Sequence, residues 1–97
     1  MIKEIENWYL SNCNGDWEHQ YGVTIESLDN PGWRIFIDLK GTKLEQIDFD
    51  EINNTASESE WIVCKVENNK FIGAGGPHKL DEILNIFIDW VKVNKAL

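Results

Sequence analysis

The stretch from Tyr21 to Leu39, YGVTIESLDNPGWRIFIDL, decides the fold of this chain. Its first part alternates Val23 and Ile25 with polar residues, the period of two expected for a half-buried strand. Asp29-Asn30-Pro31-Gly32 then supplies turn residues, because proline fixes φ and glycine permits a positive φ. The return segment, 33–39, places Trp33, Ile35, Ile37 and Leu39 on one face and Arg34, Phe36 and Asp38 on the other. The sequence therefore predicts an antiparallel hairpin.

A helix is predicted on each side of this hairpin. Between residues 2 and about 11, apolar side chains are spaced three and four apart, which is typical of a short amphipathic helix. A longer helix is predicted over about 78–95, with a wide apolar stripe that includes Leu84 and Phe87. Its acids lie in the first turn and its lysines near the end, which matches the helix dipole.

Three weaker strands are predicted between the hairpin and the second helix. They cover Thr42 to about Phe49, Glu60 to Glu67, and Lys70 to Gly73, with residues 50–59 as the longest loop. The expected fold class is α+β, in which an antiparallel four- to five-stranded meander sheet is flanked by an N-terminal helix and a longer C-terminal helix. At 97 residues, the chain is expected to form a single domain spanning 1–97.

Charge limits the classes of partner. Seventeen acidic residues against nine basic ones give a net charge of −8, which the phosphates of nucleic acid would repel. No run of residues approaches the length of a membrane span, and the N-terminus lacks a secretory h-region. We therefore expect a cytoplasmic protein that binds neither nucleic acid nor membrane directly. Cys13 and Cys64 are expected to be reduced thiols.

The loop Asn14-Gly15-Asp16-Trp17-Glu18-His19 has the densest group of polar side chains. Asp16, Glu18 and His19, with Cys13 nearby, are residue types that can perform acid–base chemistry. The same residues are also typical of a structured loop, in which Asp16 accepts backbone N–H groups and Trp17 closes the edge of the core. The structural interpretation is favoured, because no nucleophile or oxyanion device accompanies the cluster, and we expect no catalytic residues.

Other residues with metal or phosphate chemistry lack a recognisable motif. Four possible zinc ligands, Cys13, His19, Cys64 and His78, are scattered without a closed spacing. The run Gly73-Ala74-Gly75-Gly76 departs from both phosphate-binding glycine motifs, so it is interpreted as a turn into the last helix. No metal and no cofactor are expected. Trp8, Trp33, Trp61 and Trp90 lie on predicted apolar faces and are assigned mainly to the core; Trp17 is the exception.

Acidic residues are concentrated in one region. Six lie between positions 45 and 60, a stretch without Lys or Arg: Glu45, Asp48, Asp50, Glu51, Glu58 and Glu60. Such a run is typical of a solvated loop, and it is equally typical of a surface that attracts a basic partner.

Several motifs in order resemble the Imm53 family of immunity proteins from bacterial polymorphic toxin systems. They are Trp8-Tyr9, the segment CNGDWEH at 13–19, LDNPGW at 28–33, WIVCKV at 61–66, and FIGAGGP at 71–77. The resemblance implies a cytoplasmic protein without enzymatic activity that binds and blocks a toxin domain. It transfers no individual functional residue.

The predicted function is therefore stoichiometric inhibition of a cognate toxin domain, which is expected to be basic. If that toxin is a nuclease, its cleft is basic because it must hold phosphates, and an acidic protein competes for it. The candidate toxin-binding residues, chosen by charge and expected exposure, are Asp48, Asp50, Glu51, Glu58 and Glu60, followed by Asp16, Trp17 and Glu18. Two alternatives remain open. One is a small hydrolase or ligand-binding module using the Asp16, Glu18 and His19 loop; the other is a homodimer that pairs through an edge strand. The sequence leaves the oligomeric state unassigned.

Overall fold

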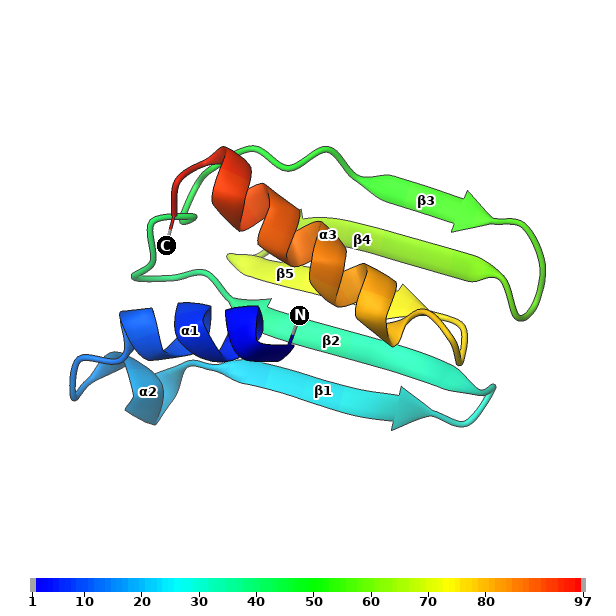
Figure 1. Cartoon of the computed structure of the whole chain (residues 1–97), viewed down its shortest axis with the longest axis horizontal. Coiled ribbons are helices and arrows are strands. Elements are labelled where there is room, and N and C mark those ends of the chain that lie inside the picture. Colours follow the sequence, from blue (N-terminus) through cyan, green and yellow to red (C-terminus); the bar gives the residue numbers. More distant parts are fainter. Residues whose placement is uncertain (1, 97) are drawn as a thin grey trace.

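A five-stranded antiparallel sheet with helices on one of its faces makes up the computed structural model, which describes residues 2–96 (Figure 1). The elements in chain order are α1 (Ile2–Asn12), α2 (Trp17–Gln20), β1 (Val23–Leu28), β2 (Gly32–Asp38), β3 (Ile52–Thr55), β4 (Trp61–Glu67), β5 (Lys70–Gly75) and α3 (Leu80–Val93). The predicted α+β class is confirmed, with a short N-terminal helix and a longer C-terminal one.

The predicted hairpin forms one side of the sheet. β1 pairs with β2 from Val23 opposite Ile37 to Leu28 opposite Gly32. The strand order is β1-β2-β5-β4-β3, so β2 pairs next with β5 and the chain crosses between β2 and β3 to reach the far edge. Segment 39–51 makes this crossing, and β3, β4 and β5 then lead back to the centre (Figure 1).

The strand predicted over Thr42 to Phe49 is wrong, because this segment forms successive turns. The N–H groups of Thr42, Glu45 and Ile47 donate to carbonyls three residues earlier, and Gln46 has φ 64°. Leu44 is fully buried and anchors these turns. The three-residue spacing of Leu44 and Ile47 follows the turns, which explains why strict alternation was absent from the sequence.

Part of the predicted loop 50–59 is instead the edge strand β3. It pairs with β4 from Ile52 opposite Cys64 to Thr55 opposite Trp61. Only Ile52 among its four side chains is partly buried. β3 is therefore held mainly by backbone pairing, which leaves little apolar pattern in the sequence.

The glycine run brings α3 close to the centre of the sheet. β5 extends to Gly75, beyond the predicted end at Gly73. A Cβ added at Gly73 would lie 2.4 Å from Cγ2 of Ile83, and one at Gly76 would lie 2.1 Å from the carbonyl oxygen of Ser59. These glycines are needed for close packing, which supports their structural interpretation.

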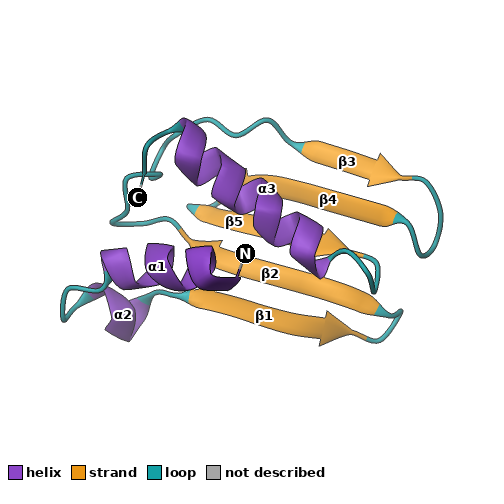
Figure 2. Ribbon diagram, viewed as in Figure 1, coloured by secondary structure: helices purple, strands orange, loops and turns teal. Residues whose placement is uncertain are grey.

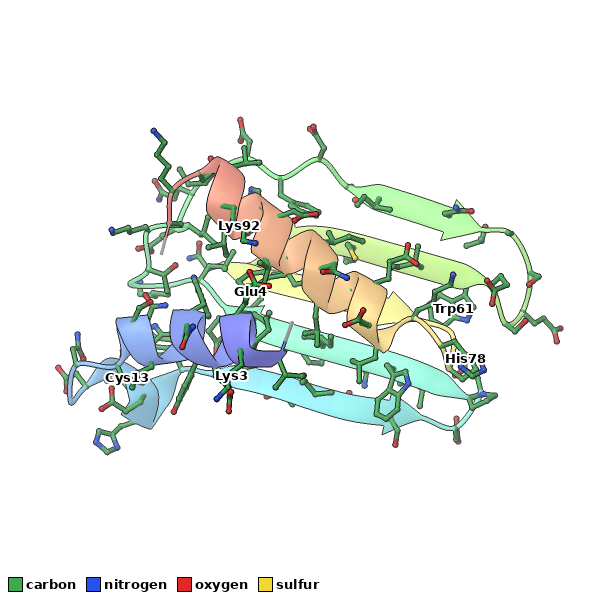
Figure 3. All side chains as sticks on the ribbon, viewed as in Figure 1. Lys3, Glu4, Cys13, Trp61, His78 and Lys92 are labelled. Atoms are coloured by element: carbon green, nitrogen blue, oxygen red, sulfur yellow. The ribbon has the colours of Figure 1, made fainter. Side chains whose placement is uncertain are left out.

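Aromatic side chains fill the layer between the helices and the sheet. Trp8 of α1 meets Phe87 of α3 edge to face at 4.9 Å between ring centroids, and Phe87 lies 5.1 Å from Phe71 of β5. Trp8, Phe71 and Phe87 are fully buried. At the surface, Lys92 of α3 forms an ion pair with Glu4 of α1 at 2.6 Å, which joins the two helices (Figure 3).

Candidate functional site

The loop before β1 is organised by its own side chains. Oδ1 of Asn14 accepts the N–H groups of Asp16 and Trp17, both at 2.9 Å, and the Glu18 carboxylate accepts those of Asn14 and Gly15, also at 2.9 Å. This network supports the short helix α2, which the sequence analysis described only as a structured loop. Trp17 is 5% exposed, and its Nε1 donates to the carbonyl of Lys40 at 2.8 Å. Trp17 therefore ties the loop to the core.

This arrangement gives little support to acid–base catalysis. Hydrogen bonds from the backbone N–H of Glu18 itself, and from Asn14 and Gly15, lower the pKa of the Glu18 carboxyl, although partial desolvation opposes them. A general acid working near neutral pH needs a raised pKa. Asp16 and His19 are exposed. A hollow of about 420 Å³ lies nearby between α1 and β1, but its lining comes from other residues, including Glu6, Tyr9 and Tyr21.

The four candidate zinc ligands are dispersed. Cys13 and His78 lie at opposite ends of the molecule (Figure 3). Within residues 2–96, no group of three or more His, Cys, Asp or Glu side chains is arranged to hold a metal ion. Both cysteines are free, and burial raises the pKa of the Cys64 thiol to about 12, with a smaller contribution from Glu82.

The acids predicted to contact a partner lie at the two ends of the edge strand β3. Asp48, Asp50 and Glu51 precede it and are exposed, whereas Glu58 and Glu60 follow it in the loop to β4. Phe49 fixes the first group, because its ring packs 5.1 Å from Trp90, whose Nε1 donates to the carbonyl of Asp48 at 3.0 Å. We refer to Asp48, Asp50, Glu51, Glu58 and Glu60 together as the acidic edge.

One member of the acidic edge is compensated by a lysine from another element. Glu60 pairs with Lys79 at 3.1 Å, and Lys79 also approaches Glu82 at 3.5 Å. The hydrogen bond to Glu60 raises the pKa of Lys79 above its ordinary value, and partial desolvation opposes this shift. The sequence showed no cation between positions 45 and 60, but the fold supplies one. In the described chain, Glu58 has no such partner.

The face of the sheet opposite the helices carries a second candidate surface, which the sequence analysis did not assign. Both α1 and α3 lie on the same side of the sheet (Figure 2). Alternation directs Ile35, Ile37, Cys64 and Phe71 toward the helices, where all four are buried. The side chains that alternate with these four along the strands point away from the helices. We call this second side the open face, and its central apolar residues are Phe36, Trp61, Val63, Ile72 and Ala74, all partly buried.

Ion pairs frame the apolar centre of the open face. Arg34 pairs with Glu26 of β1, Lys70 pairs with Asp38 of β2, both at 2.5 Å, and Lys65 approaches Glu67 at 3.6 Å. The guanidinium of Arg34 also lies 5.3 Å from the ring centroid of Phe36. The open face is therefore balanced in charge, in contrast to the chain as a whole.

A hollow of about 440 Å³ lies at the end of the sheet where β1 turns into β2 and β3 leads into β4. It is lined by Asn30, Thr55, Ser57, Glu58 and Trp61. Trp61 was assigned to the core from the sequence, but it lies on the open face and is only partly buried. The sequence of β4 contains a signal for this surface. Its apolar residues occupy both even and odd positions, so apolar side chains must lie on both faces of the sheet.

The described helices include none that is long and apolar enough to cross a membrane. Among known protein families, a model described as immunity protein 53 matches residues 2–92. No curated protein and no solved structure matches the chain.

Proposed function

The chain belongs to the immunity protein 53 family, and we propose that it neutralises a cognate toxin domain by binding it stoichiometrically through the acidic edge. The family match over residues 2–92 carries this proposal. An immunity protein has a cognate toxin as its partner. The proposal adds the mechanism, the cytoplasm of a bacterial producer cell as its location, and the kind of surface that the toxin presents.

Charge supports the choice of the acidic edge. With a net charge of −8, the protein attracts basic surfaces, and Asp48, Asp50 and Glu51 are exposed beside a fixed anchor. A nuclease has a basic cleft because it must hold phosphates, so a nuclease domain is the toxin class that this surface would best complement. Exposed charges of this kind mainly accelerate association.

The alternative of a hydrolase built on Asp16, Glu18 and His19 is less well supported. The carboxylate of Glu18 is occupied by two backbone N–H groups, and neither Asp16 nor His19 lines a described hollow. Asp16 and Glu18 thus retain only a secondary place among the proposed toxin contacts. Trp17, being buried, would contribute by holding their loop in shape.

The test uses the toxin domain encoded by the reading frame beside the gene for this protein. One variant combines Asp48→Asn, Asp50→Asn and Glu51→Gln; a matched control combines Glu6→Gln, Asp81→Asn and Asp89→Asn, which also removes three negative charges. We expect the first variant to associate about tenfold more slowly than the control at low salt, with a weaker salt dependence. Stopped-flow association rates measure this. Equal rates for the two variants would remove the acidic edge from the mechanism, and a wild-type protein that fails to bind the domain would refute the proposed function itself.

A further inference from the structure

We infer that the open face of the sheet is a second contact surface for the toxin domain, next to the acidic edge, and that the hollow beside Trp61 receives a lysine or arginine side chain of that domain. This inference rests on the proposed function, since it takes the toxin as the partner. It goes further by assigning a surface of different chemistry from the acidic edge and a specific side chain that the surface would hold.

The open face has the composition of an interface. Its centre is apolar, with Phe36, Val63 and Ile72 on three adjacent strands, and its borders carry paired charges. Apolar centres with polar rims are typical of protein interfaces. All five strands contribute to this surface, and α1 and α3 hold the sheet from behind. Such a surface requires little rearrangement on binding.

The hollow beside Trp61 has the chemistry of a site for a cationic side chain. Trp61 provides an aromatic wall, Glu58 provides a carboxylate, and the other lining residues, such as Asn30 and Thr55, are uncharged. Glu60, two residues away, is already paired with Lys79, whereas Glu58 has no ion-pair partner among residues 2–96. A cationic side chain placed here would meet both an aromatic ring and an unpaired carboxylate, the two groups that stabilise a guanidinium or ammonium.

The hollow is also well supported by its neighbours. Oγ of Ser57 accepts the N–H of Glu60 at 3.0 Å, and the N–H of Gly76 donates to the carbonyl of Trp61 at 3.0 Å. The backbone of Ser59 lies against Gly76 so closely that no side chain fits there. These contacts fix the wall formed by residues 57–61 to the β5–α3 connection.

A second copy of the chain suits this surface less well than a toxin does. The three cations on the open face, Arg34, Lys65 and Lys70, are each already paired with an acid of the same face. Two copies that each carry a charge of −8 also repel one another. A basic partner needs no free cation on the open face, and its charge is attracted to the protein and not repelled by it.

The test measures dissociation constants for the same toxin domain, after wild-type binding has been established. Trp61→Ala should weaken binding about 30-fold and Val63→Glu at least about 100-fold, mainly through faster dissociation. Val93→Glu is the control for the second variant, because it adds the same charge at a position on α3 that is 80% exposed.

Glu58→Gln should weaken binding about tenfold, whereas Asp89→Asn, its control on α3, should leave it unchanged.

Circular dichroism and urea unfolding confirm that each variant folds. If the toxin domain binds wild type but binds Trp61→Ala and Val63→Glu equally tightly, the open face is not a contact surface, although the proposed function stands. If light scattering shows a wild-type dimer that Val63→Glu converts to a monomer, the occupant of the open face is a second copy and the inference is overturned. If wild type does not bind the domain, the proposed function and this inference fall together.

Discussion

The two faces of the sheet use aromatic residues in opposite ways. On the covered face, Phe71 is fully buried and its ring meets those of Phe49, Phe87 and Trp90 at centroid distances of 5.1 to 6.5 Å. On the open face, Phe36 is only partly buried, and a charged guanidinium lies 5.3 Å from its ring centroid. The covered face thus holds the interlocking aromatic packing, and we expect the open face to contribute less to the stability of the fold.

This division has a functional consequence. We expect residues of the open face to tolerate substitution at small cost in stability, so this proposed contact surface could be altered to fit a different toxin. An immunity protein must match its own toxin, which makes such freedom useful. The comparison can be tested by making the same change on each face.

The largest expected effect comes from removing an aromatic ring. Phe87→Ala should lower the free energy of unfolding by about 3–5 kcal/mol, because it leaves a cavity among fully buried neighbours. Phe36→Ala should lower it by only about 1 kcal/mol, the scale of a cross-strand pair on a solvated face. Urea denaturation measures both values. Similar losses for the two variants would show that the open face also supports the fold.

A smaller effect is expected from adding a single methyl group on the covered side. Gly73→Ala should cost about 1–3 kcal/mol, because the new Cβ would lie 2.4 Å from the Ile83 side chain and push α3 away from β5. Gly22→Ala is the matched control, since its Cβ would meet no atom within 4 Å. We expect a change within about 0.5 kcal/mol for this control. Thermal unfolding of the two variants side by side would sharpen the comparison, and equal stability would contradict close packing of α3 on the sheet.

The covered face could be predicted from the sequence because its residues produce a period. The hairpin 21–39 alternates, and the last helix has an apolar stripe, since burial on one side imposes both patterns. β3 could not be predicted in this way. Its side chains are mostly exposed, and its position is set by backbone pairing with β4, which any sequence of moderate polarity allows.

The candidate site was predicted only in part, because sequence proximity differs from proximity in space. Asp50 and Glu58 are eight residues apart in sequence, yet β3 separates them, and Lys79 from a distant segment compensates Glu60. Trp61 was assigned to the core because apolar residues occupy both sides of β4, and only the positions of α1 and α3 decide which side is covered. The hollow beside Trp61 requires the turn at Asn30 as well, which pairing of β2 with β5 brings to the same end of the sheet.

Two neighbouring residues of β4 lie on opposite faces of the sheet and should therefore differ in accessibility. Cys64 points into the core, and burial raises the pKa of its thiol to about 12, so the thiol stays protonated and unreactive at pH 8. Val63, the preceding residue, points to the open face. In a Cys13→Ser background, which removes the partly exposed thiol, Val63→Cys should therefore add one group that reacts promptly with Ellman's reagent, while Cys64 reacts only after denaturation. Little change in stability is expected, because the substitution is on the open face. Prompt reaction of Cys64 in the Cys13→Ser parent would mean that β4 separates from the helices in the native state. The contrast between a packed face and an accessible face would then fail at β4, the strand on which the proposed toxin contacts are centred.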